Sequence, residues 1–119
     1  MEKVNRCTVI PPSDDLETIT FGPTEAEGAY FALVGHFPPG EPAPPAHTHP
    51  TTDEAFYLAS GDATFLLGDR EVRMTSGSLV FVPRGVPHTV WNSGIDPVRG
   101  IIVISPGDRE HVVLPVENG

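Results

Sequence analysis

Short runs of alternating apolar and polar residues follow one another along this chain, with turn-forming residues between them. The run AYFALVGHF (29–37) is apolar over nine positions and interrupted by His36. It is too short to span a membrane, and its aromatic and branched residues are typical of a buried strand. Further strand-like runs follow at EAFYLASG (54–61), DATFLLG (62–68), EVRMTSG (71–77), SLVFVPRG (78–85), HTVWN (88–92), VRGIIVISPG (98–107) and HVVLPVE (111–117).

These patterns predict eight or nine short strands, with a turn signal every eight to twelve residues and no amphipathic helix. Such spacing is typical of an all-β sandwich or barrel. Residues 1–20 are predicted to form an N-terminal arm or an edge strand, because residues 1–15 are polar and interrupted by Pro11 and Pro12. Residues 30–105 form the predicted barrel, and the 119 residues are expected to make one domain.

Composition and charge narrow the classes of function. The 14 prolines and 12 glycines disfavour helices. Seven basic against 16 acidic residues give a formal charge of −9, which would repel a nucleic acid. No apolar run approaches the ~20 residues that cross a bilayer, and the first residues lack the apolar region of a signal peptide, so we expect a cytoplasmic protein with no membrane partner. Cys7 is the one cysteine, which excludes an internal disulfide, and no nearby base marks it as a catalytic thiol.

The histidines gather in a way that suggests a metal site. His47 and His49 are two residues apart, so in an extended strand their side chains point the same way. The turn-like segment 50–53 is predicted to close a hairpin that returns Glu54 beside the two imidazoles. Two nitrogens and one carboxylate oxygen are a partial ligand set for a divalent metal. The alternative is a polar loop that happens to contain histidines.

His88 is the candidate for a fourth ligand. Pro83, Gly85 and Pro87 predict a tight turn just before His88, which would fix the direction of its side chain. Asn92 is expected to cap the following turn with its side-chain amide.

With His88 included, two segments resemble the two signature motifs of the cupin superfamily. The first runs from His47 and His49 through four residues to Glu54, and then through six residues to Gly61. Six residues separate its leading glycine, Gly40, from the first histidine, where the family has five. The second motif is complete and consists of Gly77, Pro83, Gly85, His88 and Asn92. The 15 residues between the motifs are a spacing similar to that of small bacterial single-domain cupins.

The resemblance implies a double-stranded β-helix, or jelly-roll, barrel with a metal ion inside its mouth. It carries the ligand roles to His47, His49, Glu54 and His88. These donors suit one divalent transition metal ion (iron, manganese, nickel, cobalt, copper or zinc). An octahedral ion would keep two open positions, and the absence of a cysteine ligand argues against a closed structural zinc site. The resemblance also implies a homodimer, for which the N-terminal arm is a strand that two copies could exchange.

Other residues receive predictions from strand parity. Phe56 shares a face with Glu54 and is the predicted pocket wall, while His36 and Arg84 are candidates for the pocket or its rim. Phe37, Leu58 and Phe65 are assigned to the core. Residues expected to face away from the metal are Asp53, Tyr57 and Trp91, and His111, near the C-terminus, is expected on the surface.

Three hypotheses for function follow. The first is an oxidoreductase similar to quercetinase-like dioxygenases, which acts on a small enol or aromatic substrate with Glu54 as metal ligand and catalytic base. The second is a non-redox cyclase or isomerase of a polyketide-type pathway, distinguished from the first by turnover without oxygen. The third is a non-catalytic module that binds a metal and a small ligand.

Overall fold

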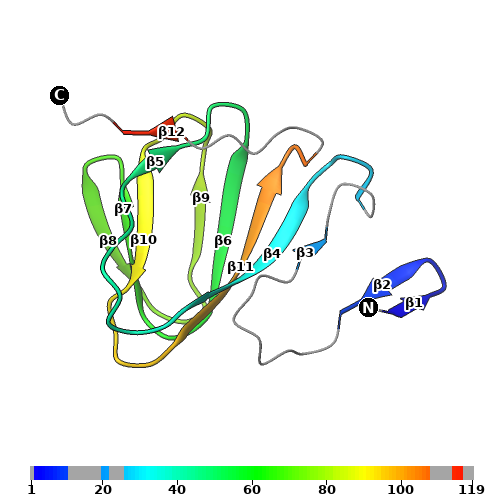
Figure 1. Ribbon diagram of the computed structural model, residues 1–119, viewed down its shortest axis with the longest axis horizontal. Coiled ribbons are helices and arrows are strands. Elements are labelled where there is room, and N and C mark those ends of the chain that lie inside the picture. The colour runs from blue at the N-terminus through cyan, green and yellow to red at the C-terminus, as the bar shows by residue number, and fades with distance from the viewer. Residues whose placement is uncertain (1, 11–19, 22–25, 108–113, 117–119) are drawn as a thin grey trace.

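Two five-stranded antiparallel sheets face each other and enclose the interior of the molecule (Figure 1). This computed structural model describes residues 2–10, 20–21, 26–107 and 114–116. One sheet has the order β12-β5-β10-β7-β8 and the other the order β3-β4-β11-β6-β9. The strands of the first are β5 (His47–Thr48), β7 (Ala63–Leu67), β8 (Arg70–Met74), β10 (His88–Asn92) and β12 (Leu114–Pro115). Those of the second are β3 (Thr20–Phe21), β4 (Phe31–Phe37), β6 (Asp53–Ser60), β9 (Leu79–Val82) and β11 (Val98–Ser105).

The chain passes repeatedly from one sheet to the other, which makes the predicted double-stranded β-helix. The strand count is higher than predicted, because the N-terminal residues form two short strands and the two-residue strand β5 (His47–Thr48) is too short to show an alternation. The N-terminal residues form a separate hairpin of β1 (Glu2–Val4) and β2 (Cys7–Val9), which stands apart from the two sheets (Figure 1). Of the predicted N-terminal arm, residues 1 and 11–19 lie outside the described residues.

Alternation within the strands explains how the sheets bury their inner faces. In β6, Phe56 and Leu58 are 1% and 0% exposed, whereas Tyr57 between them is 39% exposed. Phe56 meets Phe65 of β7 edge to face with ring centroids 5.1 Å apart, which joins the two sheets. Each such buried side chain contributes roughly 1.5–3 kcal/mol through its removal from water. The core cluster comprises Phe56, Leu58, Ala63, Phe65, Met74, Val80, Val82 and Val98.

No helix within the described residues is long and apolar enough to cross a membrane.

Candidate metal centre and its cavity

The predicted metal-site residues come together between the two sheets. His47 of β5 and His88, the first residue of β10, are direct partners in the antiparallel β5–β10 pair. Glu54 comes from the facing sheet, where it lies in β6 between Val82 of β9 and Ile104 of β11. Both sheets therefore contribute to the site.

The segment between His49 and Glu54 does not form the predicted hairpin. β5 pairs with β10 and β12, whereas β6 pairs with β9 and β11, so residues 50–52 carry the chain from one sheet to the other. Three extended residues span roughly 10 Å, which is the usual distance between packed sheets. The carboxylate reaches the imidazoles as expected, but from across the interior.

The three imidazoles form a compact triangle. The ring centroid of His47 lies 4.9 Å from that of His49 and 4.4 Å from that of His88. The centroids of His49 and His88 are 5.0 Å apart. Oε2 of Glu54 is 3.2 Å from Nε2 of His49 and 3.2 Å from Nε2 of His88. The two contacted histidines are buried and the carboxylate is 14% exposed. Glu54 therefore contacts two of the three rings in a largely dry environment.

Backbone carbonyls orient two of the rings. Nδ1 of His88 lies 2.9 Å from the carbonyl oxygen of Val86, and Nδ1 of His47 lies 3.4 Å from that of Pro45. If each Nδ1–H donates to its carbonyl, each Nε2 keeps a lone pair for a metal. The predicted turn before His88 is also held in place, since the Gly85 amide donates to the His49 carbonyl at 2.9 Å. Gly85 has φ +84°, a conformation that favours glycine.

Mutual electrostatics shift the pKa values of these groups. Burial raises the pKa of Glu54, but its hydrogen bond to His88 and the nearby histidine charges outweigh burial and leave the pKa below its usual value. Burial lowers the pKa of His88, while its bonds to Glu54 and to the Val86 carbonyl have the larger combined effect and raise it. Burial and the charge of His88 lower the pKa of His47. The site thus stabilises a carboxylate at position 54 and a neutral imidazole at position 47.

The donor geometry fits one metal ion. The ligand atoms of His47, His49 and His88 all lie within 4.8 Å of one another. Two ligands on one ion at about 2.1 Å lie about 3 Å apart when adjacent and about 4 Å apart when opposite. The 3.2 Å contacts of Glu54 with His49 and His88 match the adjacent separation. Three imidazoles could therefore hold a divalent transition metal after small movements, with the carboxylate beside them.

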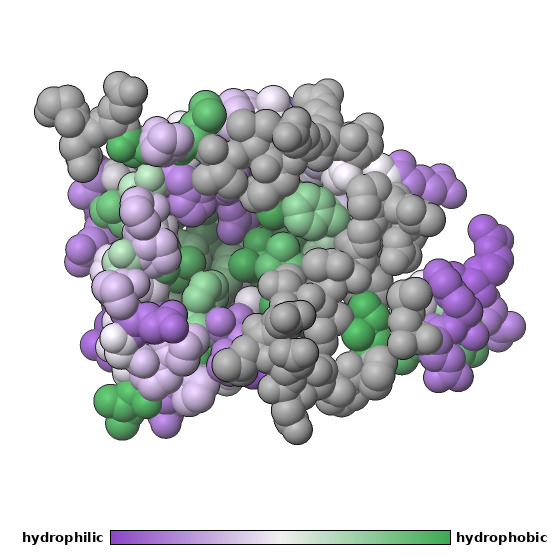
Figure 2. Space-filling model, viewed as in Figure 1, coloured by the Kyte–Doolittle hydropathy of each residue, from purple (hydrophilic) through white to green (hydrophobic). Residues whose placement is uncertain are grey.

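A cavity of about 310 Å³ opens beside these side chains. Hydrophobic side chains gather in the hollow of the face shown in Figure 2. The lining residues are Leu33, Phe37, Pro44, His47, His49, Glu54, Thr89, Val90, Ile102 and Ile104. Among the lining that the structure describes there is no lysine or arginine, so the cavity is apolar except for the metal-site groups and Thr89.

Most of this lining was not predicted from the sequence. Leu33 and Phe37 share one face of β4, and Ile102 and Ile104 share one face of β11, so period-two parity was the available signal. Parity gives two faces per strand but does not say which part of an inner face borders a cavity. Phe37, which the sequence assigned to the core, lines the cavity for this reason.

The three tentative pocket residues lie elsewhere. Phe56 shares the face of Glu54 but is 1% exposed and packs in the core, deeper than the carboxylate. His36 is adjacent to the cavity residue Phe37 in β4 and therefore points to the opposite face of the sheet. Arg84 binds Asp53, with its Nε 3.1 Å and its backbone nitrogen 2.9 Å from Oδ1, and this holds both side chains away from the cavity.

The structure also places several other residues that the sequence analysis singled out. Asp53 and the 39% exposed Tyr57 lie on the outer face of β6, as expected. Cys7 is an exposed free cysteine. His111 lies outside the described residues.

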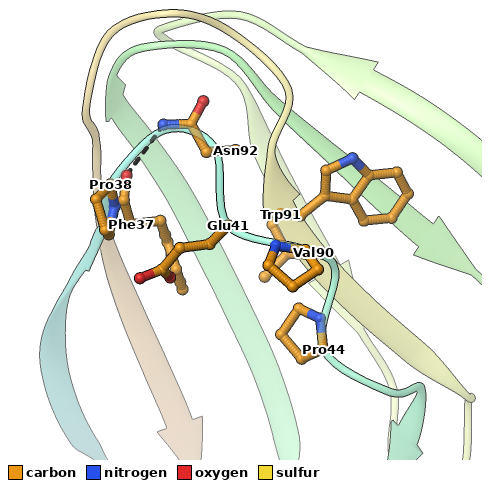
Figure 3. A pocket seen from close by; sticks show the side chains of 8 residues that line it. Phe37, Pro38, Glu41, Pro44, Val90, Trp91 and Asn92 are labelled. Carbon is orange, nitrogen blue, oxygen red and sulfur yellow. Dashed lines mark hydrogen bonds between the residues drawn. The ribbon is translucent and has the colours of Figure 1, made fainter.

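Residues 38–46, which we call the strap, follow β4 and are held against β10 by two side chains, one bonded to the residue just before the strap and one bonded within it. Nδ2 of Asn92 donates to the carbonyl oxygen of Phe37 at 3.0 Å (Figure 3). The same Nδ2 donates to the carbonyl oxygen of Asp96 at 2.8 Å. Its Oδ1 accepts from the Gly94 amide at 2.9 Å, which is the predicted cap. Thr89 Oγ1 donates to the carbonyl of Pro44 at 2.9 Å. These bonds set the position of the strap, whose Pro44 forms part of the cavity wall.

Trp91 lies beside the strap in a second, much smaller pocket of about 30 Å³. Figure 3 shows its side chain pointing away from that of Asn92. The pocket is lined by Phe37, Pro38, Glu41, Pro42, Pro44, Val90, Trp91 and Asn92. Trp91 is absent from the lining of the larger cavity, in agreement with its predicted parity.

Comparisons with known proteins agree with this architecture. The family described as "Cupin domain" matches residues 33–104. The tetracenomycin polyketide synthase protein TcmJ of Streptomyces glaucescens is 36% identical over 81 residues, which cover 66% of this chain and 54% of that protein. The chain spans about half the length of the curated relatives it matches.

Solved structures share the fold at low sequence identity. A cupin protein from Bacteroides fragilis has a TM-score of 0.72 at 14% identity, covering 88% of this chain and 89% of that one. Bacillus subtilis oxalate decarboxylase, a protein with Mn(II) centres, has a TM-score of 0.70 at 21% identity and covers 88% of this chain and 29% of that one. At these identities the likeness shows the fold alone.

Proposed function

This chain belongs to the cupin domain family, and on that premise we propose that it is a metal-dependent enzyme for a phenolic or enolic aromatic substrate. The carrying observation is the composition of the cavity, where apolar walls surround His47, His49 and Glu54. His88 completes the group of three histidines beside the cavity. At about 310 Å³ it is at the lower end of the range for ligand pockets, so a small, flat molecule suits it.

In this proposal His47, His49, His88 and Glu54 hold one divalent transition metal ion. When bound, such an ion supplies Lewis acidity toward a substrate oxygen and, if redox-active, access to oxygen chemistry. The three histidines fix the position of the ion, and the Val86 carbonyl keeps the ring of His88 in one orientation.

Glu54 has a second role as the proton acceptor. Its Oε2 borders the cavity and is held within 3.2 Å of two imidazoles, so a substrate hydroxyl near the ion would lie within reach of the carboxylate. We assign to it the removal of the hydroxyl proton, which leaves the substrate as an enolate or phenolate. Leu33, Phe37 and Ile102 would pack against the aromatic ring and exclude water.

The lining favours a neutral aromatic molecule over a small dicarboxylate. A dianion such as oxalate requires cationic or hydrogen-bonding partners when it leaves water. Apart from the proposed metal ion, the described lining offers it no cationic partner, because it contains no lysine or arginine, and Glu54 adds a negative charge. A curated relative at 36% identity is a polyketide synthase protein, which supports an aromatic substrate.

Oxygen separates the two catalytic versions of the proposal. In the first, the protein is a dioxygenase-like oxidoreductase and turnover consumes oxygen. In the second, which the likeness to TcmJ favours, it is a non-redox cyclase or isomerase that works equally well under strict anaerobiosis. The polyphenol quercetin serves as the probe, with oxygen uptake and product formation measured side by side.

Metal content and probe binding test the proposal itself. Elemental analysis of protein purified without added metal should find about one transition metal ion per chain. His88→Ala should abolish that content, whereas His36→Ala, a histidine outside the cavity, should leave it unchanged. Quercetin should bind in a calorimetric titration and oxalate should not.

Glu54→Gln tests the proton acceptor. The variant should convert the probe about 100-fold more slowly or worse, because general-base catalysis contributes at least that much. Metal retention together with unchanged turnover would remove the assigned role. Quercetin binding without turnover, in the presence of bound metal, would instead favour the non-catalytic module.

A further inference from the structure

Phe37, the last residue of β4, separates two spaces in the interior. The first is the cavity of about 310 Å³ beside the metal-site residues, and the second is the pocket of about 30 Å³ beside the strap, which we call the strap pocket (Figure 3). Among the described residues, those that line both spaces are Phe37, Pro44 and Val90. Three side chains therefore stand between the two spaces, and that of Phe37 is the largest.

The register of β11 places Phe37 at the end of the cavity that is far from the metal-site carboxylate. Glu54 is the partner of Ile104 on this strand. Phe37 is the partner of Val98, which comes six residues earlier on the same strand. Six residues of a strand span roughly 20 Å between their Cα atoms. The cavity therefore extends along β11 from the carboxylate toward Phe37.

Strand β10 of the facing sheet shows the same order of spaces. It begins at His88 in the metal site, and Val90, two residues further along, lines the cavity. Val90 also lines the strap pocket, together with Trp91 and Asn92, which follow it. Because both sheets give the same order, the strap pocket lies beyond the cavity. A molecule bound at the metal site would reach Phe37 before it reached the strap pocket.

Contacts of the backbone and of the ring hold Phe37 in this place. Its carbonyl oxygen accepts a hydrogen bond from Nδ2 of Asn92 at 3.0 Å. Its ring lies over Gly35, two residues earlier on the same face of β4. A Cβ at Gly35 would lie 3.3 Å from Cε2 of Phe37 and 3.3 Å from Cδ1 of Ile102. The missing side chain at position 35 thus allows both side chains to lie close to the sheet, which leaves the space above them open.

We propose that Phe37 determines the length of the substrate, and that the strap pocket is the subsite that a longer aromatic molecule enters when the ring is removed. This inference rests on the proposed function, because it takes the cavity as the site of an aromatic substrate. The ring of Phe37 contacts the end of the substrate that is remote from the ion, where an aromatic pair adds to affinity. A molecule longer than the cavity is stopped by the same ring. Phe37 is thus a specificity-determining residue with no part in the proton transfer.

Calorimetric titration of the metal-loaded protein with two probes tests this role. The probes are catechol, which has one ring, and quercetin, which has three. Phe37→Ala should bind catechol about 10-fold more weakly, because the variant loses an aromatic contact. Its affinity for quercetin should stay the same or rise, because the outer ring can enter the strap pocket. The ratio of the two affinities should therefore shift about 10-fold or more toward quercetin.

Two further variants serve as controls. Phe81→Ala makes the same chemical change on β9, at a side chain that is 65% exposed and outside the cavity, and should leave the ratio unchanged. Phe37→Leu keeps an apolar side chain in the partition and should shift the ratio in the same direction as Phe37→Ala, by a smaller factor. Circular dichroism and metal content should match those of the unmodified protein in every variant, because none of these residues is a metal ligand.

Gly35→Ala tests the partition from the other side. The new methyl group would displace the ring of Phe37 toward the cavity, which should weaken quercetin binding about 5-fold or more. Catechol should be affected less, because it fills less of the cavity. When Gly35→Ala is combined with Phe37→Ala, most of the effect should disappear, since no ring remains to be displaced. A loss of quercetin affinity that persists in the double variant would contradict the role of Gly35 in positioning the ring.

A crystal structure of Phe37→Ala tests the partition without any ligand. The cavity and the strap pocket should form one continuous space. Two spaces that remain separate, or an affinity ratio equal to that of Phe81→Ala, would overturn the role of Phe37 and leave the proposed function intact. A protein that binds neither probe with its metal in place would overturn the proposed function, and the role in specificity with it.

Discussion

Asn92→Asp is expected to destabilise the protein through a change of one atom. The amide Nδ2 donates at 3.0 Å to the Phe37 carbonyl and at 2.8 Å to that of Asp96, while Oδ1 accepts from Gly94. The aspartate keeps the Gly94 bond but turns an oxygen toward two carbonyl oxygens. Two lost hydrogen bonds at roughly 1 kcal/mol each, plus the desolvation of a buried carboxylate, give about 2–4 kcal/mol. For a chain of this size that lowers Tm by roughly 10 °C.

The assay is urea denaturation followed by the fluorescence of Trp91, the one tryptophan in the chain. Asn5→Asp makes the same chemical change at an exposed position and should change stability little. Burial should also raise the pKa of the new carboxyl, so the deficit should shrink as the pH falls and the group becomes a donor. A loss below 1 kcal/mol, or one equal to that of the control, would refute the assigned role of Asn92 in fixing the strap.

Three further predictions concern the surroundings of the site. Arg84→Gln should raise the pKa of Asp53, which the hydrogen bonds from Arg84 hold below its usual value, and an NMR titration will test this. Because the pair stabilises the fold only above the usual pKa of an aspartate, the variant should be less stable than the unmodified protein at neutral pH and equally stable in acid, as denaturation at the two pH values will test. Gly100→Ala should lower the free energy of unfolding by about 1–3 kcal/mol in urea denaturation, because a Cβ would lie 2.6 Å from Phe56 Cζ and 2.8 Å from the Tyr57 carbonyl oxygen. Adding Phe56→Leu should restore part of that stability. A Gly100→Ala variant as stable as the unmodified protein would contradict the close approach. Thr89→Val should cost about 1 kcal/mol by removing the bond to Pro44, and a variant as stable as the parent would show that this bond does not hold the strap.

The sequence predicted the features that depend on residues close together in the chain, namely the longer strands and the turns. Alternation located β4, β6 and β11 because each has one buried face, and the prolines and glycines around His88 indicated a turn that the structure contains. The side chain of Asn92 was expected to cap its turn, and its Oδ1 accepts a hydrogen bond from the Gly94 N–H as expected. Two-residue strands such as β5 were missed, because two residues cannot display a period.

The pairing of distant strands could not be predicted in the same way. Phe56 was expected in the pocket because it shares the face of Glu54, yet a shared face does not fix depth. Depth depends on which strand lies opposite: Phe56 faces Phe65 of the other sheet, and Glu54 faces the histidines. That choice is made by register between strands far apart in sequence, which the alternation of one strand does not contain.

The crossover at residues 50–52 explains why one carboxylate can serve both the ion and the substrate. In a hairpin, Glu54 would lie beside His49 in the same sheet, and its oxygens would lie in the plane of the histidines. From the opposite sheet, its Oε2 approaches two imidazoles from across the interior while the side chain also lines the cavity. A carboxylate in that position borders both the proposed ion and the apolar space for the substrate. The same sheet turns its alternate residues outward, so the strands that place Glu54 at the site leave Tyr57 and Phe81 exposed on the outer face.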